Sequence, residues 1–213
     1  MAGITFTERR QRQIEETRSA IVTAAAELFA ARGYVGTTIE AIAAEAGVVV
    51  QTIYNSIGSK SEVLSAVLDR AAAGPESPRP VREFMQQRAE ATRDAEGLVR
   101  VLADWFTEVQ PRTAEVHHII RQAAAVDEGI ADLEERRAIQ RFRNYVDAAK
   151  QLAARTGAAP LPTEEVAATL WCVGHPQIYR FLVETEGWDL DRYRQWVARL
   201  LTETLTQPQE VET

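Results

Sequence analysis

The sequence lacks the features that mark secreted, membrane and disulfide-bonded proteins. It has 213 residues but a single cysteine, Cys172, so an internal disulfide is excluded and a reducing compartment is favoured. No apolar run approaches the roughly 18 residues that a membrane-spanning helix needs, and no apolar segment precedes the first charges. We therefore expect a soluble, cytoplasmic protein with no membrane partner.

Signals of common enzyme classes are also missing. There is no phosphate-binding loop, no dinucleotide-binding glycine pattern and no serine nucleophile elbow. Cys172 and His175 are three residues apart and can meet on one face of a helix, as nucleophile and base or as two metal ligands. Their neighbours Val173, Gly174 and Pro176 supply no orienting acid. We expect no enzyme, no metal site and no cofactor.

The most informative stretch is residues 37–60, T-T-I-E-A-I-A-A-E-A-G-V-V-V-Q-T-I-Y-N-S-I-G-S-K. Thr37 and Glu40 form a T-x-x-E capping box, which predicts a short helix beginning near Thr38. Gly47 can adopt the left-handed backbone conformation that turns the chain into a second helix. This pattern is typical of a helix-turn-helix.

The second helix directs Ile53 and Ile57 toward the core and most of its other side chains outward. The outward set is Val49, Val50, Gln51, Thr52, Asn55 and Ser56. Outward side chains of such a helix face base edges in the major groove of DNA, while neighbouring hydroxyls and cations hold phosphates. Because this helix has no arginine, the commonest reader of guanine is missing, and we expect half-sites rich in A·T.

Three runs extend the pattern: A-A-A-E-L-F-A-A-R-G-Y, T-T-I-E-A-I-A-A-E-A-G-V and T-I-Y-N-S-I-G-S-K-S-E-V-L. Together, over residues 17–64, they resemble the DNA-binding domain of the tetracycline-repressor (TetR) family of bacterial regulators. The resemblance implies an all-α protein of about nine to ten helices. A three-helix DNA-binding domain, residues 1–61, precedes a helical-bundle ligand-binding and dimerisation domain, residues 62–213.

The resemblance also implies a repressor that binds double-stranded operator DNA and leaves it when a small-molecule effector binds. Thr38, Tyr54 and Lys60 match the positions of the family's phosphate-contacting residues, and we add Thr37 to the expected DNA-contacting set. Three positions depart from the family pattern: Val49 replaces a small hydroxyl residue, Ser56 a histidine or tyrosine, and Ile57 a phenylalanine.

Charge is unevenly distributed along the chain. Residues 1–60 hold six basic and six acidic side chains, so the whole net charge of −7 comes from the remainder. Arg9, Arg10 and Arg12 form an N-terminal arm that either reaches phosphates or a minor groove, or is a solvated helix start. The uncharged reading surface also leaves open a dimeric small-molecule-binding or interaction module that has lost specific DNA binding.

Beyond Lys60 the periodicity predicts helices interrupted by the proline-containing segments 73–80 and 158–162, by Pro111 and by residues 186–189. Apolar and aromatic side chains on their faces form a core and are also the expected lining of a site for a small, largely apolar effector. The expected lining residues are Trp105, Phe106, Phe142, Tyr145, Trp171, His175 and Tyr179.

The helix that begins at Thr163 is apolar on two opposite sides, so we expect one side to face the chain's own body and the other a second subunit. With the last helix, after Asp189, it predicts a homodimer through the two C-terminal helices. The expected interface residues are Val166, Leu170, Val173, Phe181, Trp196 and Leu200. Pro176 is expected to kink or open this helix, as a ligand-sensing element or as a bend that fits the dimer core.

Overall fold

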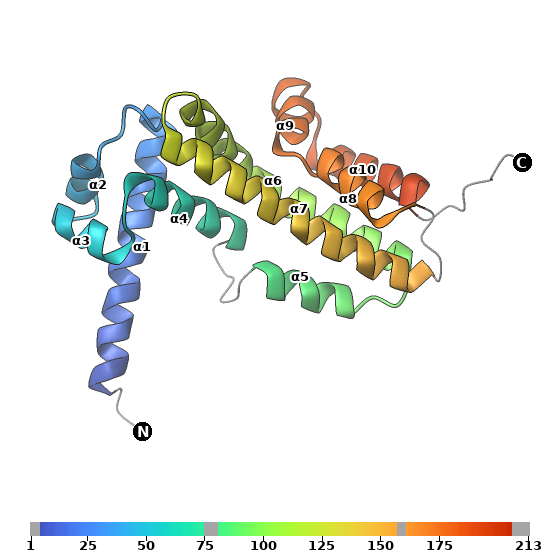
Figure 1. The fold of residues 1–213 in the computed structure, drawn as a ribbon, viewed down its shortest axis with the longest axis horizontal. Helices are drawn as coiled ribbons and strands as arrows, with labels where there is room; N and C mark the ends of the chain where they lie inside the picture. The colour runs from blue at the N-terminus through green and yellow to red at the C-terminus, as the bar shows by residue number, and fades with distance from the viewer. Residues whose placement is uncertain (1–4, 75–80, 157–160, 206–213) are drawn as a thin grey trace, which may run out of the picture. The chain divides into compact units, whose positions relative to one another are not determined.

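The computed structural model describes residues 5–74, 81–156 and 161–205, and every regular element in these ranges is a helix (Figure 1). The predicted all-α class is confirmed. In the described ranges, none of the helices combines the length and the apolar character that crossing a membrane requires. The elements are α1 (Phe6–Arg32), α2 (Ile39–Glu45), α3 (Val50–Ser56), α4 (Lys60–Ala73), α5 (Val81–Glu90), α6 (Ala95–Ala124), α7 (Glu128–Thr156), α8 (Thr163–Val173), α9 (Pro176–Tyr179), the π-helical turn η1 (Arg180–Thr185) and α10 (Leu190–Leu205).

The chain divides into two compact units. The first unit combines Met1–Ala71 with Glu115–Glu134, and the second combines Ala72–Ala114 with Glu135–Thr213. The first unit is therefore larger than the predicted head of residues 1–61. The reason is that α4 and the segment from 115 to 134 add buried apolar side chains, such as Leu64 of α4, to its core.

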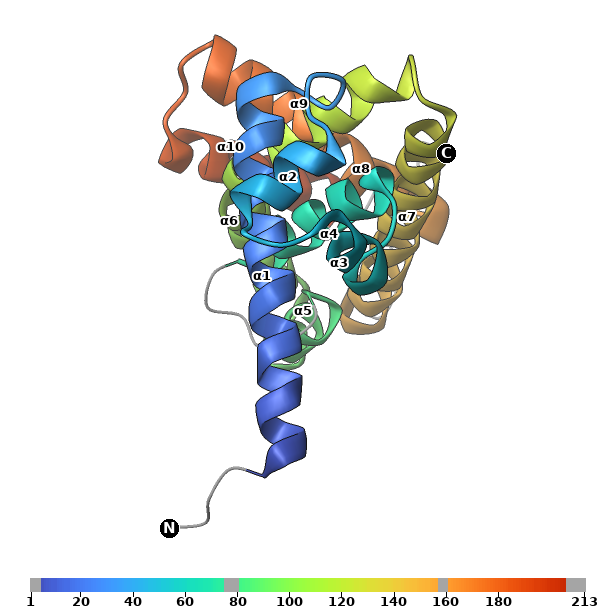
Figure 2. The same ribbon diagram turned by 90° about the vertical axis from the view of Figure 1, so that its left-hand side faces the viewer.

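The core of the first unit is built where α1, α2 and α3 meet (Figure 2). Each of these helices places one isoleucine completely inside: Ile21, Ile42 and Ile53. Gly33 ends α1 and Gly47 turns the chain between α2 and α3, both at positive φ, 67° and 66°, which an L side chain rarely adopts. The predicted glycine turn of the helix-turn-helix is confirmed.

The start of α2 differs from the prediction by one residue. Thr38, not Thr37, is the cap, and its Oγ1 accepts a hydrogen bond of 3.1 Å from the backbone N–H of Ala41. Thr37 is 0% exposed, and its hydroxyl lies within hydrogen-bonding distance of two carbonyl oxygens, that of Leu28 in α1 at 3.1 Å and that of the α1 cap, Gly33, at 2.8 Å. The predicted Thr37–Glu40 capping box is therefore wrong, because that hydroxyl already serves the C-terminal end of α1.

The core of the second unit contains large side chains from α6, α7, α8 and α10, among them Phe106, Leu170 and Tyr193. The predicted helix from Thr163 ends at Val173, and a new helix begins with Pro176 at its first position, where a missing N–H costs nothing. The chain thus opens at Pro176, one of the two expected outcomes.

The break between α8 and α9 is tightly packed against neighbouring side chains. The buried Gln110 donates a hydrogen bond of 2.6 Å from Nε2 to the carbonyl oxygen of Gly174. A Cβ atom at Gly174 would lie 2.5 Å from Cζ of Phe106, which is closer than real contacts allow. Only glycine therefore fits at this position. The prolines expected to break the helix near 73–80 lie outside the described residues. The interruption predicted at Pro111 is wrong, because α6 continues through this residue.

Candidate nucleic-acid interface

Helix α3 presents most of its side chains to solvent. Its seven residues include one buried side chain, Ile53. Val49, at the cap, is 69% exposed and Tyr54 is 51% exposed. Gln51 and Asn55 are also exposed, whereas Thr52 and Ser56 are half-buried. Val50 differs from its predicted outward orientation, because it is half-buried and packs against the core.

Two of the exposed α3 side chains are joined to each other. Nε2 of Gln51 donates a hydrogen bond of 2.9 Å to Oδ1 of Asn55, one helical turn later. This bond sets the orientation of both amides, with the acceptor Oε1 of Gln51 and the donor Nδ2 of Asn55 as the remaining groups. One acceptor and one donor is the combination that adenine requires in the major groove, through its N6 amino group and N7.

The three expected phosphate contacts have different surroundings. Thr38 and Tyr54 are exposed at the surface of the first unit, while Lys60 is half-buried at the first position of α4. Thr37, also in the expected set, is fully buried with its hydroxyl engaged, so it has no surface to offer DNA. That assignment is corrected: Thr37 is a structural residue.

Lys60 lies in a site formed with Tyr34 and Asp127. Its Nζ lies 4.0 Å from the centre of the Tyr34 ring, and the Tyr34 hydroxyl donates a hydrogen bond of 3.2 Å to Oδ2 of Asp127. Burial lowers the pKa of Lys60, while the Asp127 carboxylate opposes this shift. Burial, with Asp127, raises the pKa of Tyr34 well above its usual value. A carboxylate therefore competes for the cation expected to bind phosphate.

Sequence reasoning missed Asp127 and also Arg18. Asp127 lies 93 residues from Tyr34 in the chain, so no local pattern indicates that they meet. Nη1 of Arg18, from α1, donates a hydrogen bond of 2.7 Å to the carbonyl oxygen of Ser56, the last residue of α3. A cation at this helix end is favourable, because the carbonyl groups there carry partial negative charge.

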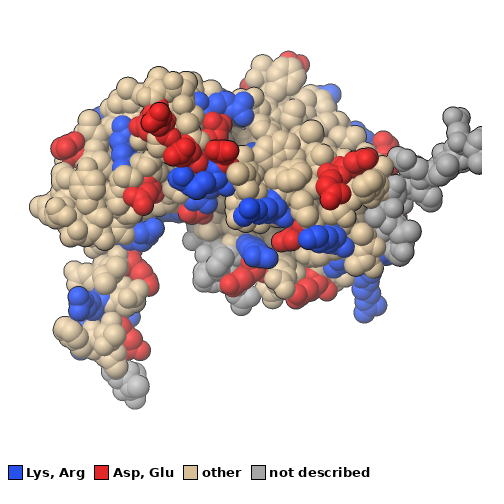
Figure 3. Space-filling model, in the orientation of Figure 1, with Lys and Arg blue, Asp and Glu red and all other residues tan. Residues whose placement is uncertain are grey.

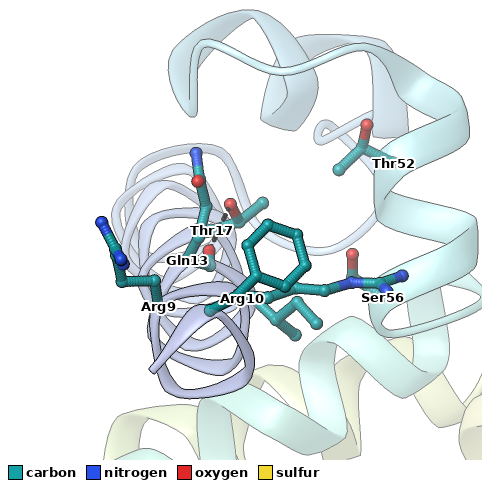
Figure 4. A pocket seen from close by; sticks show the side chains of 8 residues that line it. Arg9, Arg10, Gln13, Thr17, Thr52 and Ser56 are labelled. Atoms are coloured by element: carbon teal, nitrogen blue, oxygen red, sulfur yellow. Dashed lines mark hydrogen bonds between the residues drawn. The ribbon is translucent and has the colours of Figure 1, made fainter. Parts of the chain in front are cut away.

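The start of α1 lies next to this surface. In the space-filling view, basic and acidic side chains are interspersed along the protruding part of α1, and no broad single-sign patch covers the face shown (Figure 3). A groove separates this part of α1 from α3 and is lined from both helices (Figure 4). The lining residues are Phe6, Arg9, Arg10, Gln13, Ile14, Thr17, Thr52 and Ser56.

In the second unit, five of the seven expected ligand-lining residues form one aromatic cluster. The ring centres lie 6.0 Å apart for Phe106 and Tyr145, 6.4 Å for Tyr145 and Trp171, 6.1 Å for Phe142 and Trp171, and 5.7 Å for Trp171 and His175. The other two rings have different neighbours: Trp105 lies 6.1 Å from Phe84 of α5, and Tyr179 lies 5.4 Å from Tyr193 of α10.

This aromatic cluster has polar groups around it. The Arg141 guanidinium lies 4.3 Å from the centre of the Trp171 ring, and burial raises the pKa of Tyr145 to about 12. The side-chain oxygens Oη of Tyr193 and Oε1 of Gln110 are buried without a hydrogen-bond partner in the described structure. Such groups are uncommon in protein interiors, where polar atoms are normally paired.

The candidate catalytic pair is separated by the opening between α8 and α9. Cys172 is exposed on α8, whereas His175 precedes α9 and its Nδ1 accepts a hydrogen bond of 3.2 Å from the backbone N–H of Gln177. The two residues therefore do not share a continuous helical face. Among the described residues, no group of three or more His, Cys, Asp or Glu side chains is arranged to hold a metal ion.

Three of the expected dimer contacts need correction. Val166, Leu170 and Val173 are buried in the core of their own chain, so their surface is already covered. Phe181 is 55% exposed, and Trp196 and Leu200 are half-buried at the surface. A two-sided apolar pattern indicates burial on two sides but does not identify the side that belongs to the chain's own core.

Comparisons with known proteins agree with this geometry. Residues 21–67 match the family model described as bacterial regulatory proteins, tetR family. The chain is 30% identical over 185 residues to the HTH-type transcriptional repressor SCO4008 of Streptomyces coelicolor, and the match covers 81% of this chain and 86% of that protein.

Solved structures share the fold. NalD of Pseudomonas aeruginosa, the secondary repressor of the MexAB-OprM multidrug efflux pump, is 20% identical with a TM-score of 0.72, covering 91% of this chain and 98% of NalD. A protein of Saccharomonospora viridis, described as a transcriptional regulator and solved in complex with choline, is 21% identical with a TM-score of 0.64, covering 91% and 99% of the two chains.

The Asp127→Asn variant is expected to bind double-stranded DNA about two- to fivefold more tightly than the original chain. The substitution removes the carboxylate whose charge attracts the half-buried Lys60, and an attraction between partly exposed charges is worth up to about 1 kcal/mol. Asparagine keeps an oxygen for the backbone N–H of Ile130, which Asp127 caps at 3.1 Å. Fluorescence anisotropy with a labelled duplex measures the change.

Asp132→Asn is the matched control, because Asp132 is exposed on the same helix and loses the same charge. Equal gains in the two variants would show a general charge effect and contradict a specific role for Asp127.

Proposed function

We propose that this chain, which belongs to the tetR family of bacterial regulatory proteins, is a transcriptional repressor released from its operator by a small molecule. It is a DNA-binding transcriptional regulator. The observation that carries the proposal is the exposed surface of α3, on the same family scaffold as a repressor that it matches over 86% of that protein's length. We place its activity in the cytoplasm, where operator DNA is found.

The DNA-reading surface in this proposal is the exposed side of α3. The linked amides of Gln51 and Asn55 read adenine, and the exposed Val49 contacts a thymine methyl group. Thr38, Tyr54 and Lys60 hold phosphates and set the position of α3 without selecting a sequence. Val50 and Thr52 contribute less contact area than the sequence pattern indicates, because both are half-buried.

The effector site in this proposal is the aromatic cluster of the second unit. Aromatic side chains favour apolar ligands. Among the described residues, the buried oxygens of Tyr193 and Gln110 have no hydrogen-bond partner and offer polar anchor points nearby, because Tyr193 belongs to this core and Gln110 bonds to Gly174 beside Phe106. One structural relative holds choline, a quaternary ammonium ion. In this chain Arg141 already occupies a face of Trp171, so we favour a neutral, largely apolar effector over a cationic one.

The repressor in this proposal is a homodimer that pairs through its C-terminal region. Operators with two half-sites need a partner related by two-fold symmetry. The exposed Phe181 and Ile178, with the half-buried Trp196 and Leu200, are among the apolar side chains of the C-terminal helices that remain at the surface. We therefore assign the interface to these residues instead of Val166, Leu170 and Val173.

Footprinting on the DNA upstream of the chain's own gene should reveal a protected site, and binding selection should return half-sites rich in A·T. Asn55→Ala is expected to lose about 1–3 kcal/mol of discrimination at one base pair, because it removes one amide and releases the other. Lys60→Ala is the contrasting variant, since a lost phosphate contact weakens binding to all sequences alike. Half-sites dominated by G·C that Asn55→Ala leaves unchanged would contradict this assignment.

A screen of small apolar compounds against the protein–operator complex should identify compounds that release the DNA. Trp171→Ala is expected to reduce this response at least tenfold while the affinity of the unliganded protein for DNA stays unchanged, because the ring is central to the aromatic cluster. Trp105→Ala is the control, since its ring contacts Phe84 and lies outside the cluster. A response lost in the Trp105 variant but kept in the Trp171 variant would place the effector site elsewhere.

Phe181→Asp is expected to convert a dimer into a monomer, because a carboxylate would be buried without a partner at the interface. Light scattering coupled to size-exclusion chromatography measures the mass. Ile139→Asp makes the same change at another exposed apolar residue, on α7, and should leave the dimer intact. A dimer that survives the Phe181 substitution would move the interface away from this residue.

A further inference from the structure

The first part of α1 does not pack against a hydrophobic core. Residues 6–20 include no buried side chain, and the first buried residue of α1 is Ile21. An isolated helix of roughly 12–15 residues is marginal in water. This one begins with a complete capping box: Oγ1 of Thr5 accepts a hydrogen bond of 3.3 Å from the N–H of Glu8, whose carboxylate accepts one of 2.6 Å from the N–H of Thr5.

The side of α1 that faces α3 has a regular composition. Phe6, Arg10, Gln13, Ile14 and Thr17 recur at three- and four-residue spacing, so they share one face of the helix. They form one wall of the groove, and Thr52 and Ser56 of α3 form the other. The groove has a volume of about 570 Å³. The side chain of Arg10 extends from α1 in the direction of Ser56 (Figure 4).

The side chains that line the groove suit a polymer with negatively charged phosphate groups. Both charged lining residues are arginines, Arg9 and Arg10, and no acidic side chain lines it. The remaining polar lining consists of one amide and three hydroxyl side chains, which are group types that can donate hydrogen bonds to phosphate oxygens. The Thr17 hydroxyl already donates to the carbonyl oxygen of Gln13, which leaves Gln13, Thr52 and Ser56 as the donors. Phe6, which is 78% exposed, adds an apolar surface against which a sugar ring can pack.

The position of the groove points to the same DNA that α3 reads. Thr52 and Ser56 each follow an exposed amide residue, Gln51 and Asn55, directly in the chain, so the groove begins at the edge of the reading surface. A duplex seated on α3 therefore brings a backbone alongside α1. Charge complementarity favours this occupant over an apolar peptide, because the groove's cations would remain unpaired beside apolar side chains.

We propose that the groove between α1 and α3 holds the sugar–phosphate backbone of one operator strand, with Arg10 as the cation that positions it. The inference rests on the proposed function, because it takes DNA to be bound by α3. It assigns the N-terminal arm a defined side: Arg10 faces the strand, whereas Arg12, about 200° further around the helix, faces away and does not line the groove. Arg10 adds affinity and fixes the register of α3 on the duplex.

The test compares Arg10→Gln with Arg12→Gln in the full chain, on the upstream DNA fragment protected in footprinting. Both substitutions remove one charge from an exposed position of the same helix and preserve helix propensity. Arg10→Gln should weaken binding about tenfold and reduce the slope of log affinity against log salt concentration by about one. It should also remove hydroxyl-radical protection of the sugars beside the base pairs that Asn55 reads. Arg12→Gln should change neither the slope nor the protection.

Failure of the inference is distinguishable from failure of the proposed function. If Asn55→Ala alters binding but Arg10→Gln matches the original chain, the groove does not hold DNA and the regulator still stands. Equal losses in the Arg10 and Arg12 variants would likewise overturn the inference, because they would indicate a general charge effect. If the original chain protects no DNA, the proposed function itself fails. Loss of dimer mass in the Arg10 variant with unchanged DNA affinity would assign the groove to a second copy of the chain.

Discussion

The proposed reading surface on α3 depends mainly on the burial of one side chain, Ile53. Helix α3 has seven residues, too few to be stable alone, and Ile53 is its single fully buried residue. The neighbouring side chains Ile21 and Ile42 complete the core at the meeting point of three helices. Val50 of α3 also packs partly against this core, whereas Gln51, Tyr54 and Asn55 stay exposed and are available for contact with DNA. The orientation of these exposed side chains therefore follows from the packing of Ile53 and Val50.

The charged groups near α3 come from neighbouring elements and not from α3 itself. Helix α3 carries no cation, and the positive groups near it belong to other elements: Arg18 of α1 on the last carbonyl of α3, Lys60 of α4 over the Tyr34 ring, and Arg9 and Arg10 of α1 along the groove. Arg18 and Lys60 already have partners inside the protein. In the proposed complex, DNA competes with these partners for Arg18 and Lys60 but not for the arginines of the groove. Selectivity in that proposal rests on neutral groups, chiefly the linked amides of Gln51 and Asn55.

Local patterns in the sequence predicted the helices and the glycine turns well, because capping, periodicity and positive φ are properties of short segments. They were less successful for features that depend on contacts with residues elsewhere in the chain. The cap of α2 was misplaced by one residue because the Thr37 hydroxyl bonds to Leu28 and Gly33, outside the capping motif. The expected dimer face was placed partly on Leu170 because an apolar stripe does not reveal which partner covers it. The Asp127–Tyr34 contact spans 93 residues and left no trace in any local pattern.

The glycine between α8 and α9 constrains how this chain can change over generations. Gly174 is held by Gln110 and leaves no room for a Cβ against Phe106, a member of the aromatic cluster. A lineage that exchanges Gly174 first would pass through an unstable intermediate, whereas one that first makes room at both Phe106 and Tyr145, whose Oη would lie 2.8 Å from the new Cβ, would open the space that Gly174 lacks. The order of substitutions is therefore restricted. The aromatic cluster must therefore change before the backbone beside it can.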